Sequence, residues 1–210
     1  MSSWTLGGYP SISQYIVNSY LNNKDIEEIY DDLFKENNRE TREIISTFSN
    51  AFKHFPFDIN TLYFSPIHIA PINIVSKKIS NLKATMVTYP FDDISSWTNN
   101  LESTINGLNK LLNEWEIGLI RLNKIKTDNK YIKEINIVAE ALYLIYSSAL
   151  NQFKYLGKYI SYEEYKSIEK NIVIKFYKLC ATNSFIGFEA ANQYMLTQNM
   201  FLEKIISLIL

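Results

Sequence analysis

The residues whose types best suit catalysis are two adjacent carboxylates, Asp92 and Asp93. Two carboxyl groups can divide general-acid and general-base duties when their surroundings push their pKa values apart. Glycoside hydrolysis uses such a pair on either side of the sugar. Adjacent residues rarely face each other in that way, so we favour a helix start in which Asp93 or Ser95 caps a helix through Leu101. A role of the pair in a site stays open.

Nucleophilic and metal-binding side chains are few. His54 and His68 are the only histidines and Cys180 is the only cysteine, and their spacing matches no metal motif. His54 stands among phenylalanines, which favours a packed or hydrogen-bonded ring, whereas His68 lies in an irregular stretch and stays a candidate for contacting a ligand. Cys180 stands in an apolar pattern typical of a core. No phosphate loop or dinucleotide fingerprint occurs, so we predict no metal and no cofactor.

Aromatic residues gather outside the regular helical patterns. Their flat apolar faces could stack on sugar rings while their polar tips bond to hydroxyl groups. The alternative is that they line the seam between a loop and a bundle. The candidates for carbohydrate binding are Trp4, Tyr9, Tyr63, His68, Asp92, Asp93 and Trp97.

A helix predicted from Ile186 to Leu208 carries polar groups among apolar ones. Glu189 and Gln193 are four residues apart, so they share one helix surface. If that surface packs inward, its polar groups need partners. We predict a buried polar network of Glu189, Asn192, Gln193 and Tyr194, with direct ligand contact as the alternative.

Composition narrows the class of protein. Apolar residues make up 47% of the chain and tyrosine and phenylalanine are plentiful, which favours a folded core over disorder. The net charge of −1 supplies no basic face for nucleic acid or for an anionic membrane, so neither is a predicted partner. The first residues lack the pattern of a signal peptide. We expect a soluble, cytoplasmic protein.

The elements that would position these residues are mainly helical. We predict one domain with short helices over 1–54, an irregular and partly extended segment over about 55–97, and a bundle of long helices over 98–210. The middle segment holds four of the five prolines and the strand-like runs Thr61–Phe64 and Ala84–Tyr89. Ordered loops of this length tend to be functional, so we place the site there.

Apolar residues at spacings of three and four predict where the helices run. One helix starts after Asp25, and another covers about 39–53. Asp128-Asn129 separates the first two long helices, and Ser161 with Glu164 forms a capping box before the next. Long helices with short connections pack antiparallel.

Four blocks occur in one order along the chain, namely Trp4–Ser11, Phe48–Phe57, Ala84–Asp93 and Ile186–Tyr194. Their order resembles the C-terminal region of large bacterial proteins of a glycoside-hydrolase-like family. In that family an (α/β) barrel precedes a helical region. The chain departs from the family's usual Gly-Pro-Ala-Asn turn at Ala70-Pro71-Ile72-Asn73.

The resemblance implies that Trp4–Tyr9 is similar to the exit of a final barrel strand, where barrel enzymes place their sites. The catalytic carboxylates would then lie in a barrel that this chain lacks. We expect a helical domain that packs on the barrel, lends residues to its carbohydrate site and is inactive alone.

Two other functions stay open. The apolar run Ile205–Leu210 suits a non-enzymatic interaction module, and a homo-oligomer is possible. A complete small hydrolase would need Asp92, Asp93 and Glu189 close together in space.

Overall fold

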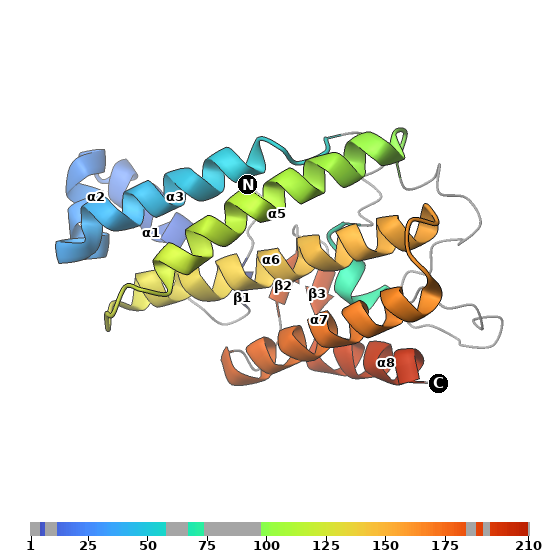
Figure 1. The fold of residues 1–210 in the computed structure, drawn as a ribbon. Helices are drawn as coiled ribbons and strands as arrows, with labels where there is room; N and C mark the ends of the chain where they lie inside the picture. Colours follow the sequence, from blue (N-terminus) through green and yellow to red (C-terminus); the bar gives the residue numbers. More distant parts are fainter. Residues whose placement is uncertain are drawn as a thin grey trace.

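The structure, a computed structural model, describes residues 5–6, 12–57, 67–73, 98–183, 188–190 and 194–209. These residues form a helical bundle, which confirms the mainly α fold class (Figure 1). Consecutive long helices pack against each other, and each runs antiparallel to the one before it. The bundle helices are α3 (Asn38–Phe52), α5 (Leu101–Leu122), α6 (Lys130–Leu156), α7 (Tyr162–Asn183) and α8 (Gln198–Ile209).

Shorter helices cover one end of the bundle. They are α1 (Ile12–Leu21), α2 (Ile26–Phe34) and the 3-10 helix η1 (Lys35–Asn37), which leads directly into α3. Helix α2 packs on α3 through a fully buried stripe that includes Ile29 and Leu33. In Figure 1 these blue elements lie at the end of the molecule opposite to the start of α5.

Several helices start where a side chain accepts hydrogen bonds from the free backbone N–H groups of the first turn. Asp25 Oδ1 accepts from Glu27 N at 2.8 Å, so the predicted start of α2 is confirmed. Ser161 and Glu164 exchange hydrogen bonds as a capping box, at 2.8 Å from Ser161 N and 3.2 Å from Glu164 N. Asn129 caps α6 through Tyr131 N at 2.9 Å, which confirms the break before that helix.

The predicted cap of α5 is wrong. Residues 98–100 are not helical, and α5 begins at Leu101. Asn100 has extended backbone angles, and its Oδ1 accepts from Ser103 N at 3.0 Å. An asparagine next to the helix satisfies the first free N–H groups, so α5 takes its cap from Asn100. Asp93 and Ser95 lie outside the described residues.

The centre of the core is an aromatic seam between α3, α5 and α6. The ring of Trp115 lies 4.6 Å from Phe48 and 5.7 Å from Tyr146, and its indole N–H donates to Ala139 O at 2.9 Å. All three rings are at least nine-tenths buried. The seam joins three helices by apolar burial while the one polar atom of the indole keeps a partner.

A short stretch of the irregular segment is part of this core. Residues 67–73, which contain the 3-10 helix η2 (Ala70–Ile72), are all buried. They contact α6, α7 and α8. The strand-like runs Thr61–Phe64 and Ala84–Tyr89 lie outside the described residues.

Three short strands form an antiparallel sheet in the order β1-β2-β3. The first, β1 (Thr5–Leu6), pairs with β2 (Phe188–Ala190), which pairs with β3 (Tyr194–Leu196). The single helix predicted over Ile186–Leu208 is therefore wrong, and α8 begins only at Gln198. Strand β2 gains its hydrogen-bond partner from the opposite end of the chain, which local periodicity cannot reveal.

One glycine permits the close packing of α3 on α5. A Cβ at Gly118 would lie 2.5 Å from Phe48 Cε1. We expect Gly118→Ala to lower the free energy of unfolding by about 1–3 kcal/mol, because overpacking displaces the Phe48 ring. The measurement is urea unfolding followed by circular dichroism, with Asn106→Ala on the exposed face of α5 as control. A Gly118→Ala protein as stable as the wild type would contradict this packing.

Candidate functional site

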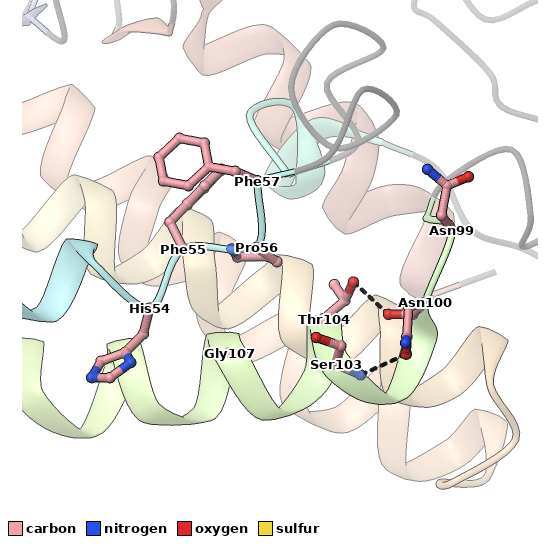
Figure 2. Close-up of a pocket in the computed structure, with 9 residues that line it drawn as sticks. All are labelled: His54, Phe55, Pro56, Phe57, Asn99, Asn100, Ser103, Thr104 and Gly107. Atoms are coloured by element: carbon pink, nitrogen blue, oxygen red, sulfur yellow. Dashed lines mark hydrogen bonds between the residues drawn. The ribbon is translucent and has the colours of Figure 1, made fainter.

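An open pocket of about 460 Å³ lies where the chain leaves α3 and where it enters α5 (Figure 2). This volume falls within the roughly 300–1,000 Å³ typical of small-molecule sites. One wall is the segment 54–57, and the other is formed by residues 99–107. The lining residues are His54, Phe55, Pro56, Phe57, Asn99, Asn100, Ser103, Thr104 and Gly107.

The two walls approach each other at Gly107. A Cβ at this position would lie 2.7 Å from His54 O and 3.7 Å from Pro56 Cβ. Only a residue without a side chain lets the segment after α3 lie directly on α5. The width of the pocket therefore depends on a backbone contact.

Hydrogen bonds fix the polar wall at the start of α5. The Thr98 and Thr104 hydroxyl groups lie 2.6 Å apart, and Thr104 Oγ1 donates to Asn100 O at 2.9 Å. The Asn100 amide oxygen is bonded to Ser103 N. These bonds hold the backbone of the wall, while Asn99 and Ser103 are exposed beside it.

The opposite wall is aromatic. Phe57 is 60% exposed and lies 4.8 Å from the buried ring of Phe55. Phe55 in turn contacts Phe52 at 5.1 Å and Tyr146 at 6.0 Å. The pocket thus has an accessible aromatic face supported from behind by the core.

Among the described residues that line the pocket, His54 is the one ionisable residue. Its Nε2 lies 3.0 Å from Glu114 Oε1 on α5, and the two side chains are 36% and 42% exposed. In Figure 2 its ring points along α5, away from Phe57 and Asn99. The groups that face the pocket are therefore neutral amides, hydroxyls and rings, and the predicted hydrogen-bonded role of His54 is confirmed.

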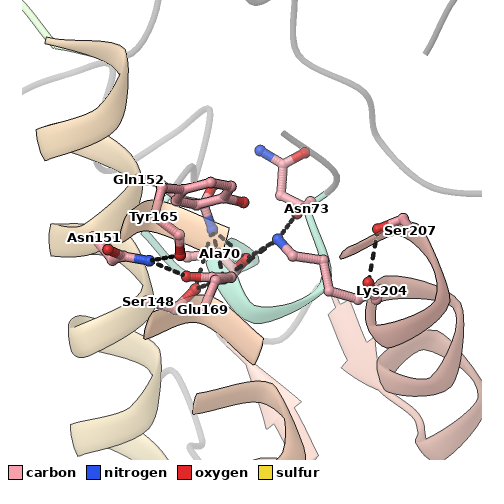
Figure 3. A network of polar contacts seen from close by, with 9 residues as sticks. All are labelled: Ala70, Asn73, Ser148, Asn151, Gln152, Tyr165, Glu169, Lys204 and Ser207. Carbon is pink, nitrogen blue, oxygen red and sulfur yellow. Dashed lines mark hydrogen bonds and ion pairs between the residues drawn. The ribbon is translucent and has the colours of Figure 1, made fainter. Parts of the chain in front are cut away.

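A second cluster of polar groups is enclosed in the bundle (Figure 3). Lys204 of α8 and Glu169 of α7 form an ion pair at 3.3 Å, and both side chains are 0% exposed. The ammonium also donates to Asn73 O and to Ala70 O, the latter at 3.5 Å. Its three N–H groups thus have three oxygen acceptors. Burial lowers the pKa of Lys204, while the charge of Glu169 opposes that shift.

Helix α6 completes this cluster from the other side of Glu169. Ser148 Oγ donates to Glu169 Oε1 at 2.5 Å, and Asn151 Nδ2 donates to Glu169 Oε2 at 2.9 Å. Gln152 Nε2 donates to Ala70 O at 2.5 Å and lies 3.3 Å from Glu169 Oε1. Two buried charges are tolerated here because both are paired and hydrogen-bonded.

Of the residues predicted to bind carbohydrate, His68 is the one that falls within the described part of the chain. His68 is 5% exposed and its ring stacks on Phe55 at 6.1 Å, so it belongs to the core behind the pocket. Cys180 is fully buried, and burial raises the pKa of its thiol to about 12, which fits the predicted core role. The other carbohydrate candidates lie outside the described residues, namely Trp4, Tyr9, Tyr63, Asp92, Asp93 and Trp97.

The polar network predicted at the end of the chain does not lie on a helix. Glu189 is in β2 and Tyr194 is in β3, so the helical spacing used to group them does not apply. Asn192 and Gln193 lie outside the described residues. The network that the structure describes has different members. A charged residue within an apolar stripe could have signalled it, as Glu169 is flanked by Tyr165 and Ile172, and Lys204 by Phe201 and Leu208.

No protein family, characterised protein or solved structure matches this chain. None of the described helices is long and apolar enough to cross a membrane. Among the described residues, no group of three or more His, Cys, Asp or Glu side chains is arranged to hold a metal ion. The pocket and the enclosed ion pair are thus the features from which a function can be argued.

The burial of His68 makes the free energy of unfolding depend on pH. Burial lowers its pKa from 6.5 to about 4, so the unfolded chain binds the proton more readily. The contribution of neutral His68 to stability is complete above pH 6.5 and is lost as the pH falls towards 4. The loss amounts to about 3 kcal/mol.

The measurement is an NMR titration of the imidazole together with unfolding of the wild type and His68→Phe. The difference in unfolding free energy between the two proteins should shift in favour of the phenylalanine variant as the pH falls. A His68 imidazole that titrates near pH 6.5 in the folded protein would contradict its burial.

Proposed function

We propose that this chain is a helical accessory domain of a glycoside-hydrolase-like protein, and that its pocket binds part of a carbohydrate. The observation that carries the proposal is that an exposed aromatic residue, Phe57, and neutral amide and hydroxyl groups line the same pocket. A pyranose ring offers apolar C–H faces and hydroxyl edges, which match those two walls.

The chemistry of the walls favours a neutral sugar. An aromatic ring contributes through its apolar face. Asn99 and Ser103 offer donors and acceptors without a formal charge, as the hydroxyl groups of a sugar require. The lining residues that the structure describes include no Lys or Arg that could pair with a carboxylate or phosphate group of an anionic ligand.

The resemblance of the chain to the region that follows an (α/β) barrel supports the assignment as an accessory domain. In such an arrangement the barrel supplies the catalytic carboxylates, and the helical domain supplies binding contacts. The chain alone would then bind sugar without hydrolysing it.

A binding experiment tests the pocket directly. We expect saturable NMR chemical-shift changes in residues 54–57 and 99–107 on addition of maltose, cellobiose or diacetylchitobiose. Phe57→Ala should raise the Kd about two- to tenfold, because an aromatic contact contributes about 0.5–1.5 kcal/mol beyond its burial. The matched control is Tyr20→Ala, since Tyr20 is 67% exposed on α1 at the far end of the bundle.

If Phe57→Ala and Tyr20→Ala changed the Kd equally, the result would contradict sugar binding in this pocket. The absence of shifts with all three disaccharides at millimolar concentration would overturn the carbohydrate assignment.

A second candidate is self-association through α8. Leu202, Ile206 and Ile209 are 40%, 55% and 58% exposed and are spaced by four and three residues, so they form one apolar stripe. This spacing is that of a seam between two helices, and an apolar stripe is complementary to its own copy. A second copy of the chain is therefore the partner that this stripe would fit.

Light scattering after size-exclusion chromatography tests this second candidate. If it holds, the protein runs as a dimer at micromolar concentration and Ile206→Glu converts it to a monomer. Leu21→Glu, at the exposed end of α1, serves as the control and should leave the dimer intact. A wild type that is monomeric at all concentrations would exclude self-association through α8.

A further inference from the structure

The loop of residues 67–73 is attached to the bundle by the buried lysine of α8. Lys204 Nζ donates to the backbone oxygens of Ala70 and Asn73, at the two ends of η2. Gln152 adds a bond to Ala70 O from α6. Figure 3 shows these bonds converging on one turn of the loop. The loop is thus held through its backbone, at a point fixed by two helices.

The same loop presents a ring to the back of the pocket. His68 lies two residues before Ala70, and its imidazole stacks on Phe55 with an interplanar angle of 13°. Both rings are at most 5% exposed. A shift of the loop would therefore move a ring that is packed in a dense core, and Phe55 would have to follow.

Phe55 supports the aromatic wall of the pocket. Its ring contacts Phe57 at 4.8 Å and Tyr146 at 6.0 Å. Tyr146 is part of the core of α6 and does not yield easily. Phe57 is the exposed member of this group, so it is the ring most free to respond when Phe55 moves.

We propose that Lys204 is a positioning residue for the pocket. It acts through loop 67–73, His68 and Phe55 on the orientation of Phe57, and it touches no ligand itself. This inference rests on the proposed function, because it assumes that Phe57 contacts a sugar. The physical basis is a continuous series of contacts, from an ammonium group to two backbone carbonyls and then through the rings of His68, Phe55 and Phe57.

The length and charge of Lys204 suit it to positioning loop 67–73. An ammonium group at the end of a four-carbon chain reaches oxygens on two different segments, Glu169 on α7 and the carbonyls of the loop. An apolar side chain at position 204 could fill the same space but would not hold the loop backbone in one register. Lys204 therefore determines where the loop lies as well as how tightly α8 packs.

The test compares two folded variants. Lys204→Met combined with Glu169→Gln removes the tether and both buried charges. The glutamine keeps one amide oxygen that can accept from Asn151, and its amide N–H can donate to the Ser148 hydroxyl group. Phe201→Leu is the matched control on α8, because the Phe201 ring packs on Phe176 of α7 at 4.7 Å and the tether stays in place. Should the double variant not fold, Gln152→Met removes the second bond to Ala70 O and is expected to act in the same direction.

Two readouts separate positioning from stability. The first is the NMR shift of the His68 ring protons, which Phe55 displaces by its ring current; with two histidines in the chain these signals can be assigned by substitution of His54. The second is the Kd for the disaccharide that binds the wild type best. We expect the double variant to lose the ring-current shift and to raise the Kd at least about fivefold, the lower end of typical coupling between sites. The control should retain both values.

Each outcome bears on the inference. Unchanged His68 signals and an unchanged Kd in the double variant would overturn it. Equal changes in the Phe201→Leu protein would also overturn it, since the effect would then follow from general loosening of α8. If the wild type binds no disaccharide, the proposed function fails, whereas the His68 signals still decide whether Lys204 sets the position of the loop.

Discussion

The burial of one ammonium group constrains more of this structure than any other interaction. An unpaired charge in an apolar interior is costly, so a buried lysine requires oxygen atoms around it in a fixed arrangement. Lys204 obtains them from Glu169 and from the backbone of loop 67–73. Glu169 in turn requires donors, which α6 provides. Three helices and one loop must therefore meet at a single point.

This requirement explains how an irregular segment is held against a regular bundle. Helices pack by burying apolar stripes, and that packing tolerates small shifts along the helix axis. Hydrogen bonds to the backbone oxygens of Ala70 and Asn73 are directional and allow little shift. The loop is thus located more precisely than apolar burial alone would achieve, and the ring of His68 is located with it.

The charged and the neutral polar groups of the site have separate uses. The charges of Lys204 and Glu169 pair with each other inside the protein, where solvent does not reach them. The described lining of the pocket instead exposes an aromatic ring, amides and a hydroxyl, and the side chain of His54 is hydrogen-bonded to Glu114. Such a division suits recognition of a neutral ligand, because no buried charge has to be rearranged when the ligand enters.

The sequence by itself determined the long helices, because an apolar residue every three or four positions can be buried only by a helix packed on a neighbour. It also determined the starts of α2, α6 and α7, where Asp25, Asn129 and Ser161 bond to N–H groups a few residues away. Tertiary structure alone decided the strand β2, whose partner Thr5–Leu6 is distant in sequence, and the pairing of Lys204 with loop 67–73. It also decided the pocket, whose walls meet at Gly107 because two segments separated by about fifty residues cross there. Local patterns report bonds between neighbours, whereas these contacts depend on which distant segments the folded bundle brings together.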